Sequence, residues 1–262
     1  MITFDDGPLP PYSNIILDAL ASHCVKATYF LVGQMAHAYP SVVRRIYNEG
    51  HAIGTHSQRH PHFERLSMQR VEREVDGGIN SVTAALGDAK VLSPFFRIPY
   101  LGRTNAIERL LERKQLVTWS ADVDTNDWWR GSSPEAIVQR TMRRLNAKGR
   151  GIILMHDIHR KTAMALPFLL KELKANGYNV VQVVAAGERL KSIPELIASP
   201  ATDGKTMPTK LTNASNGDHT LAARQNHRIK KRSASRHHQA HSWSQADQMM
   251  TTKRPFWTFS GY

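Results

Sequence analysis

Short apolar runs alternate with longer amphipathic stretches from the beginning of the chain to about residue 184. A short apolar run bounded by turn-forming residues is typical of a buried strand, whereas apolar residues at helical spacing indicate a helix. This pattern predicts strands at residues 2–4, 26–31, 51–54, 95–98, 116–121, 151–155 and 178–184. It predicts helices near residues 13–24, 35–49, 67–86, 104–114, 133–148 and 162–176.

The regular alternation of strands and helices predicts an α/β fold with parallel strands. About seven strands with helices between them indicate a distorted (β/α) barrel, closed or nearly closed. In such barrels the chemistry gathers in the loops that follow the C-terminal ends of the strands. The residues directly after each predicted strand are therefore the first candidates for function.

Two adjacent carboxylates, Asp5 and Asp6, follow the first predicted strand, and Gly7-Pro8 comes next. Like charges repel unless a cation, a proton or an arginine compensates them. The alternative is an ordinary turn, because Asp, Gly and Pro are common turn residues. After the third predicted strand, His56 and His60 stand four residues apart, a spacing that suits a divalent cation. In a chain with 13 histidines such a pair also arises by chance.

Further polar residues follow the next predicted strands. Arg97 and Tyr100 follow the fourth, Asp127 and Trp128 follow the fifth, and His156 follows the sixth. Taken singly, an arginine here indicates a structural ion pair, a histidine indicates a capped core residue, and a tryptophan indicates core packing. Taken together, five strands that end in catalytic types of residue indicate a single active site.

These segments resemble the five ordered motifs of the NodB-homology polysaccharide deacetylases, carbohydrate esterase family 4. The resemblance runs from Met1 to about Ile193 and implies that residues 1–195 form one distorted (β/α) barrel domain. The matching segments are residues 3–8, 56–60, 97–100, 124–128 and 154–156.

By this resemblance, Asp6, His56 and His60 would hold a divalent metal, most commonly Zn²⁺, with open positions for water. Asp5 would be the general base that activates the attacking water. Arg97 would pair with this base and keep it ionised. Hydrolysis of an N-acetyl amide needs a Lewis acid, an activated water and an acid for the leaving nitrogen, so each role has a candidate.

The same resemblance makes His156 the general acid that protonates the leaving amine, with Asp127 orienting and charging its imidazole. The backbone N–H of Tyr100 would stabilise the oxyanion of the tetrahedral intermediate. Leu154 and Trp128 would shape a small apolar pocket for the acetyl methyl group.

The chain departs from the family pattern in two places. Leu101 stands between Tyr100 and Gly102, where the family has glycine directly, so we expect a reshaped wall on the oxyanion side. The first strand is very short, which is expected to loosen the paired aspartates. Three other residues near the motifs are expected to be structural or on the surface: Asp157, His159 and Trp129.

The sequence favours removal of N-acetyl groups from N-acetylglucosamine-containing glycans, meaning chitooligosaccharide, chitin or peptidoglycan. Two alternatives of the same fold remain open, an O-acetyl xylan esterase and a cyclic-amide hydrolase. A third alternative is a non-catalytic glycan-binding module, although such a module would need neither the acid nor the base. An acetylated glycan is the expected partner in each deacetylase or glycan-binding reading.

The formal charge of +13 is unevenly distributed. Residues 201–262 carry ten Lys or Arg against three Asp, which accounts for +7. We expect residues 196–262 to be a basic, low-complexity and mostly disordered tail. A solvated extension explains its charge better than specific nucleic-acid binding, because aromatic residues are not regularly interleaved; on an envelope enzyme it would instead touch anionic wall polymers.

The single cysteine, Cys24, excludes an internal disulfide, and its position beside an apolar helix predicts a buried, inert thiol. No apolar run reaches the length of a membrane span. The visible start shows no export signal, yet the expected substrates lie outside the cytoplasm. We therefore expect an extracytoplasmic enzyme (periplasm, envelope or secreted) with a leader upstream of Met1.

Overall fold

The computed structural model describes residues 1–185, so the expected tail at 196–262 lies outside the described residues. One sheet of seven parallel strands forms the centre, in the order β5-β4-β3-β2-β1-β7-β6. The strands are β1 (Ile2–Asp5), β2 (Thr28–Leu31), β3 (Ala52–Thr55), β4 (Phe95–Phe96), β5 (Val117–Thr118), β6 (Val123–Asp124) and β7 (Ile153–His156). The curled sheet confirms the predicted distorted (β/α) barrel.

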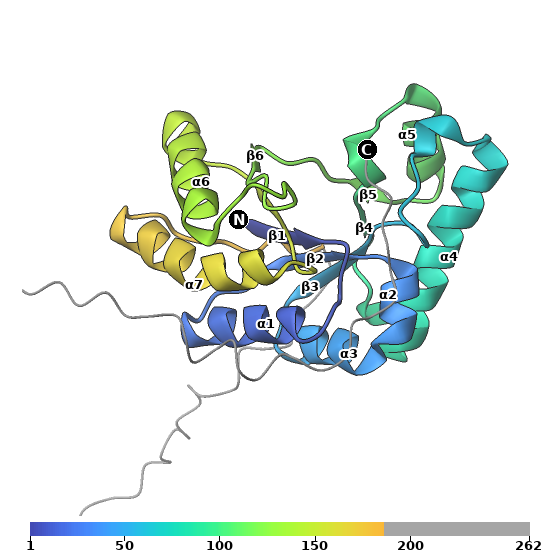
Figure 1. Cartoon of the computed structure of the whole chain (residues 1–262). Helices are drawn as coiled ribbons and strands as arrows, with labels where there is room; N and C mark the ends of the chain where they lie inside the picture. The colour runs from blue at the N-terminus through green and yellow to red at the C-terminus, as the bar shows by residue number, and fades with distance from the viewer. Residues whose placement is uncertain (186–262) are drawn as a thin grey trace, which may run out of the picture. The chain divides into compact units, whose positions relative to one another are not determined.

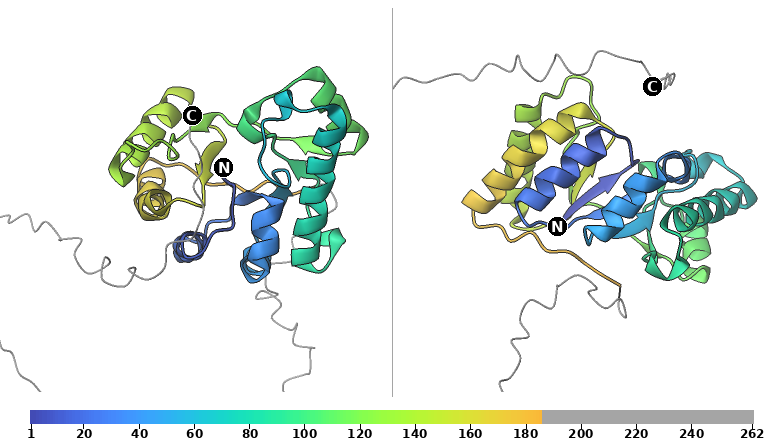
Figure 2. Two further views of the ribbon diagram at one scale, coloured as in Figure 1. Left: turned by 45° about the vertical axis from the view of Figure 1, so that its right-hand side comes forward. Right: turned by 90° about the horizontal axis from the view of Figure 1, so that it is seen from below.

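The helices cover the outer face of this sheet (Figures 1 and 2). In Figure 1 they form an arc from α6 and α7 through α1 and α3 to α4 and α5. Their bounds are α1 (Tyr12–Ser22), α2 (Gly33–Ala38), α3 (Pro40–Asn48), α4 (Met68–Leu86), α5 (Asn105–Arg113), α6 (Pro134–Lys148) and α7 (Arg160–Ala175). Three single turns of 3-10 helix are η1 (Phe63–Arg65), η2 (Ala89–Val91) and η3 (Pro99–Leu101).

Strand β1 shows how the sheet sorts its side chains. Ile2 and Phe4 belong to the main apolar core, together with residues of α1 and α7. Because successive side chains of a strand point to opposite faces, Thr3 and Asp5 point into the barrel. β1 is paired with β2 on one side and β7 on the other, and all four of its residues are buried. These two ladders hold the strand that was expected to be loose.

The inside of the barrel has a small apolar cluster of its own. Phe30, Ala52 and Phe95 form it, and Trp119 and Ala185 pack against it. The Arg97 guanidinium lies over the Phe30 ring, with 4.2 Å from Cζ to the ring centroid. The barrel interior thus combines this apolar cluster with the buried guanidinium of Arg97, which packs on it.

Two of the predicted strands differ in the structure. The strand predicted at 116–121 is shorter, because only β5 (Val117–Thr118) pairs with β4, and the chain then forms a strand that was not predicted, β6 (Val123–Asp124), which pairs with β7. The structure has no strand at 178–184: Val180 packs against the main core, and the Gln182 Nε2 donates to the Gly50 carbonyl at 3.0 Å. This last segment has the right composition for a strand but runs outside the ladders.

The predicted helix at 35–49 is two helices, α2 and α3. Pro40 has no N–H to donate and disfavours the α conformation in the residue before it, and Tyr39 accordingly has φ −130° and ψ 55°. Cys24 is exposed, which corrects the expectation of a buried thiol. Its backbone is left-handed, with φ 54°, because it lies in the turn just after α1. Within the described residues, no helix combines the length and apolar character needed to cross a membrane.

Candidate active site and metal centre

The loops at the C-terminal ends of the strands bring five of the predicted residues into one cluster. Asp5 ends β1 and Asp6 follows it, His56 and His60 lie in the loop after β3, and Arg97 follows β4. Within the cluster Asp5, His56 and Arg97 are buried, and the other two are partly exposed. The sequence therefore placed all five in the right loops.

A set of three donor groups lies at the centre of the cluster. One ligand atom from each of Asp6, His56 and His60 lies within 4.8 Å of the others. Asp6 Oδ1 is 3.5 Å from the Nε2 of His56 and 3.4 Å from the Nε2 of His60. The two Nε2 atoms are 3.1 Å apart. Two imidazole nitrogens and one carboxylate oxygen on a shared centre are a donor set that suits zinc.

Both histidines direct their Nε2 atom toward the centre of the donor set. The Nδ1 of His56 lies 2.6 Å from the Arg97 carbonyl. Because a carbonyl only accepts, the proton of this contact is on Nδ1, which leaves Nε2 to face the centre. Burial lowers the pKa of His60 to about 4, so its ring is neutral at pH 7.

The aspartate of the donor set also fits a cation. Its Oδ1 is buried and has no hydrogen-bond partner among the described residues. Burial on its own would raise the pKa of Asp6, but the nearby histidines His156, His60 and His56 lower it overall. An ionised, buried oxygen without a donor is the kind of group that a metal ion satisfies.

Asp5 faces a different partner. Its Oδ1 accepts a hydrogen bond from the Arg97 Nη1 at 2.7 Å, and both side chains are almost fully buried. The same Nη1 donates to Thr3 Oγ1 at 2.8 Å, and Nη2 donates to the Ser120 carbonyl at 2.9 Å. These contacts fix the guanidinium and give the Asp5 carboxylate a fixed positive neighbour.

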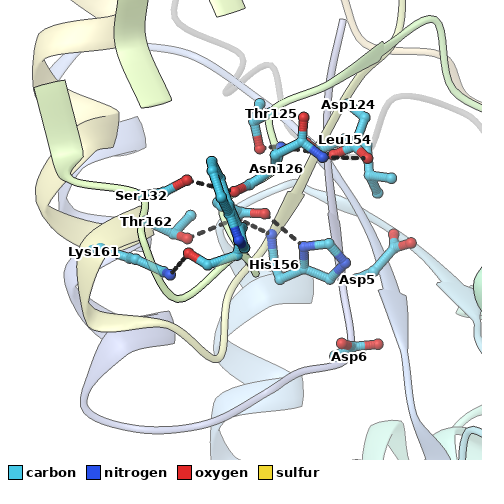
Figure 3. A network of polar contacts seen from close by, with 12 residues as sticks. Asp5, Asp6, Asp124, Thr125, Asn126, Ser132, Leu154, His156, Lys161 and Thr162 are labelled. Carbon is cyan, nitrogen blue, oxygen red and sulfur yellow. Dashed lines mark hydrogen bonds and ion pairs between the residues drawn. The ribbon is translucent and has the colours of Figure 1, made fainter. Parts of the chain in front are cut away.

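His156 and Asp127 form a second charge pair, which belongs to the polar network around His156 in Figure 3. Asp127 Oδ1 is 2.7 Å from the His156 Nδ1, and its Oδ2 accepts from the His156 backbone N–H at 2.7 Å. The Thr162 hydroxyl donates to the same Oδ2 at 2.7 Å. Burial alone would lower the pKa of His156, but Asp127, with smaller contributions from Asp6 and Asp5, raises it to about 10. The imidazole therefore holds its proton at neutral pH.

Two arginines of α6 hold the loop that carries Asp127. Arg140 Nη1 donates to the Thr125 carbonyl at 2.6 Å, and Arg144 Nη1 donates to Asn126 Oδ1 at 2.7 Å. Asp124 in turn accepts from the Asn126 backbone N–H at 2.7 Å. The loop is thus fixed from outside the barrel while its carboxylate points inward to His156.

The backbone of these loops is unusual. Non-glycine residues with positive φ among the described residues gather here, although such a backbone is unfavourable for them. Six lie in the site loops: Asp6 (76°), Ser57 (68°), His60 (60°), Tyr100 (56°), Leu101 (55°) and Asn126 (50°). Leu101 and Tyr100 are the left-handed positions of the reshaped third-motif loop. At the neighbouring Gly102 a Cβ would lie 2.6 Å from Glu64 Oε2, so a larger residue there would displace the Glu64 side chain.

The three predicted substrate residues lie at different depths. Leu154 points to the same face of β7 as His156 and is buried, whereas Trp128 and Tyr100 are 52% and 57% exposed. The Tyr100 ring stacks on His62, with 3.6 Å between centroids, and its centroid is 4.5 Å from that of His60. An exposed aromatic ring therefore lies directly beside the donor set.

Sequence reasoning missed several supporting residues. Thr3 could have been found, because it lies two residues before Asp5 on the same face of a strand. Ser57, whose Oγ accepts from the His60 backbone N–H at 2.8 Å, lies inside the second motif. Thr162 gave no signal, since only folding brings the first turn of α7 to Asp127. Asp157, expected to be structural or on the surface, is fully buried.

Known proteins resemble this chain in sequence and in fold. The family described as polysaccharide deacetylase matches residues 1–119. A peptidoglycan-N-acetylglucosamine deacetylase of Bacillus cereus is 33% identical over 188 residues, which make up 70% of this chain and 84% of that protein. The peptidoglycan-N-acetylglucosamine deacetylase PgdA of Listeria monocytogenes is 32% identical over 194 residues. That match covers 72% of this chain but only 39% of the longer relative.

Solved structures agree. A peptidoglycan deacetylase of Bdellovibrio bacteriovorus has 34% sequence identity and a TM-score of 0.66, over 72% of this chain and 52% of that one. A mutant of a protein described as a CE4 family pseudoenzyme has 28% identity and a TM-score of 0.63, over 70% of this chain and 64% of that one. By its sequence and its fold, this chain belongs to the polysaccharide deacetylase family.

Proposed function

We propose that the chain is a metal-dependent deacetylase that hydrolyses N-acetyl groups of N-acetylglucosamine-containing glycans, with peptidoglycan and chitooligosaccharide as the substrate class. One observation carries the proposal. A donor set for a cation, an arginine-held carboxylate and a carboxylate-held imidazole gather at the same end of the sheet. Metal-assisted hydrolysis of an amide uses these three kinds of group together.

In this proposal Asp6, His56 and His60 hold the divalent metal, and their nitrogen and oxygen donors favour zinc. When bound, such a metal supplies Lewis-acid activation of the acetyl carbonyl and of the attacking water. Asp6 keeps its negative charge for this purpose, because the surrounding histidines lower its pKa. His56 and His60 complete the donor set with one imidazole nitrogen each.

Asp5 takes the proton from the attacking water. Its Oδ1 is engaged with Arg97, while its Oδ2 lies 3.7 Å from the His56 Nε2, on the side of the donor set. The buried guanidinium holds this carboxylate in one orientation. Arg97 therefore orients the base rather than touching the substrate.

His156 gives a proton to the leaving nitrogen. The Nδ1 is held by Asp127, so Nε2 is the atom that faces the reaction. The raised pKa keeps this proton available at neutral pH. Tyr100 would offer its backbone N–H to the oxyanion, and Leu154 and Trp128 would border the acetyl methyl group.

The substrate class is supported by the relatives, several of which are named as peptidoglycan or chitooligosaccharide deacetylases. The two exposed aromatic rings of Tyr100 and Trp128 also suit a sugar, since aromatic faces stack on sugar rings. Such a substrate would be met outside the cytoplasm, and fractionation of cells that express the protein tests that compartment.

The likeness to a pseudoenzyme supports a second candidate, a glycan-binding module without activity. The Asp5–Arg97 and His156–Asp127 pairs argue against it, because binding alone requires neither a general base nor a general acid. The two candidates differ in one direct observation: whether acetate is released while the glycan is bound.

The test is incubation of the purified, zinc-loaded chain with acetylated chitooligosaccharides and with peptidoglycan fragments, followed by mass spectrometry. We expect stepwise loss of acetyl groups, abolished in Asp5→Asn and His156→Gln and retained in His37→Ala, a control that changes an exposed histidine of α2. Binding without acetate release would favour the module. Release of acetate from acetylated xylan alone would favour the O-acetyl xylan esterase. Turnover of a cyclic amide alone would favour the cyclic-amide hydrolase.

We also propose that residues 1–195 are sufficient for this activity and that the basic segment after them contributes only to polymer binding. Deletion of residues 200–262 should leave turnover of short oligosaccharides unchanged. Reduced, salt-sensitive binding to anionic wall polymer in the deletion variant would assign the segment to that partner.

A further inference from the structure

We propose that Asp157 is a positioning residue that fixes the loop carrying Asp5 and Asp6 relative to the strand carrying His156. The roles of those three residues rest on the proposed function above. Asp157 itself touches neither the donor set nor the reacting atoms, so it acts through the loop.

The first contact is a bridge through a hydroxyl group. Asp157 is fully buried, and its Oδ2 accepts a hydrogen bond from the Ser13 Oγ at 2.6 Å. The same Oγ accepts from the backbone N–H of Leu9 at 2.7 Å. The carboxylate after β7 is thus connected through α1 to the loop that follows Asp6.

The second contact is the packing of the carboxylate against Gly7, the residue directly after Asp6. A Cβ at Gly7 would lie 2.1 Å from Asp157 Oδ1 and 2.2 Å from Oδ2, so the carboxylate fills the space of the missing side chain. On its other side, the Gly7 carbonyl accepts from the Val32 backbone N–H at 3.2 Å. Gly7 is therefore held between Asp157 and the end of β2.

The backbone at this point reaches both halves of the site. The His156 N–H donates to Asp127 Oδ2 at 2.7 Å, and the next N–H, that of Asp157, donates to the Asp5 carbonyl at 3.3 Å. Two successive amides thus connect the acid pair to the base. The Asp157 side chain then extends this connection by two further residues, to Gly7 and Leu9.

This arrangement answers a physical need of the loop. Asp6 has φ 76°, a left-handed backbone that a non-glycine residue keeps only when its surroundings over-determine it. Burying a carboxylate is itself unfavourable unless specific contacts compensate. The Ser13 hydroxyl satisfies Oδ2, whereas Oδ1 has no hydrogen-bond partner among the described residues and packs against Gly7, so the cost of burial is offset only in part. Together the two contacts confine the residues on the C-terminal side of Asp6.

The test compares Asp157→Ala, Asp157→Asn, Ser13→Ala and the double variant Ser13→Ala/Asp157→Ala with the unmodified chain. Thr141→Ala is the matched control, because Thr141 is fully buried on α6 and donates to the Ile137 carbonyl at 2.7 Å, away from the site. Two quantities are measured: hydrogen exchange of the Leu9 and Val32 amides in metal-free protein, and zinc affinity by chelator competition.

For Asp157→Ala we expect exchange at Leu9 and Val32 to accelerate by about tenfold or more, and zinc affinity to fall by about 10- to 100-fold, the usual range for residues that support metal ligands. Asp157→Asn keeps an oxygen for Ser13 and should recover most of both quantities. The double variant should lose less than the two single variants added together, because Ser13 and Asp157 share one contact. Thr141→Ala should change neither quantity.

Unchanged exchange at Leu9 and Val32 in Asp157→Ala would overturn the proposal, and so would exchange that rises equally throughout α6. This measurement needs no metal and no substrate. A wild-type chain that bound no zinc, or released no acetate, would contradict the proposed function while the exchange rates still decided the role of Asp157.

Discussion

Asp5 and His156 are register partners on the adjacent parallel strands β1 and β7. Partners in register point to the same face of a sheet, so the base and the acid start from neighbouring positions inside the barrel. Arg97 pairs with the first and Asp127 with the second. Asp5 thus has a cationic partner and His156 an anionic one, and Asp127 keeps the imidazole of His156 protonated at neutral pH, as the proposed acid requires.

The acid should depend on Asp127. In Asp127→Asn the main cause that raises the pKa of His156 to about 10 is removed, so the imidazole should lose its proton at lower pH. We expect kcat at pH 7 to fall by about 10²- to 10⁴-fold. The alkaline limb of the kcat/KM profile should move to lower pH. The measurement is a pH–rate profile, together with an NMR titration of His156 in metal-free protein.

The same pair predicts a pH dependence of folding. The folded pKa of His156 lies above the ordinary value of 6.5, so its stabilising contribution is complete below pH 6.5 and is lost as the pH rises through about 10. In urea unfolding of metal-free protein, the free energy of unfolding of the wild type should fall as the pH rises through about 10, and that of Asp127→Asn should fall less. Thr162→Val, which removes one hydrogen bond to Asp127, should give an intermediate result; an unchanged alkaline limb in both variants would contradict the assignment.

The paired aspartates should separate by their effect on zinc. Asp6→Asn and His60→Ala remove donors and should weaken zinc binding by more than the roughly 10- to 100-fold seen for supporting residues. Asp5→Asn should keep zinc and lose activity, because its partner is Arg97. Zinc content after dialysis, measured with circular dichroism as a check on folding, distinguishes these outcomes. Zinc loss in Asp5→Asn with intact folding would show that the two roles are reversed or shared.

Arg97 should be the most sensitive position for stability. Arg97→Met leaves the buried Asp5 carboxylate without its partner, which typically costs about 3–5 kcal/mol of unfolding free energy. The double variant Asp5→Asn/Arg97→Met should be less destabilised than the two single variants added together, because it removes both charges. Urea unfolding of the four proteins measures this coupling, and simple additivity would rule out the pair as a buried unit.

Trp128 should act on the glycan rather than on the reaction. Its ring is 52% exposed, and loss of a stacking contact of about 0.5–1.5 kcal/mol corresponds to a roughly two- to tenfold higher KM. We expect Trp128→Ala to raise KM for chitooligosaccharides with kcat nearly unchanged. Trp129→Ala is the matched control, since Trp129 is 56% exposed and was not assigned to the substrate. Equal effects in both variants would remove the distinction between the two rings.

The site was easier to predict from sequence than the sheet. Asp5, His56, Arg97 and His156 are directly adjacent to apolar strands, and a barrel brings strand ends together whatever the exact ladder order. The hydrogen-bond partners of Asp127 and Asp157 were harder, because Thr162 and Ser13 lie on helices whose rotation about the barrel no local pattern specifies. The sequence placed Asp157 among the structural or surface residues, and its contacts could not be read because its partners are far away in sequence.

The errors in the fold have local and non-local causes. The break at Tyr39-Pro40 was readable, because proline disfavours a continuous helix, and the longer apolar pattern obscured it. The segment at 178–184 alternates like a strand, but its place is decided by the Gln182 contact to Gly50 and by the packing of Val180. Strand propensity alone does not show which edge of a sheet is available.

The order of the strands has a consequence for how this protein can fail. The metal-ligand candidates and the Asp5–Arg97 pair lie at the ends of β1, β3 and β4, which are on one side of the β1–β7 ladder. The acid pair, His156 and Asp127, lies at the ends of β7 and β6 on the other side. On the roles proposed above, loss of His156 or Asp127 alone would remove the acid while leaving the metal-ligand candidates, Asp5 and Arg97 in place. A protein of this fold that binds its ligands without hydrolysing them would therefore need substitutions only at the acid pair.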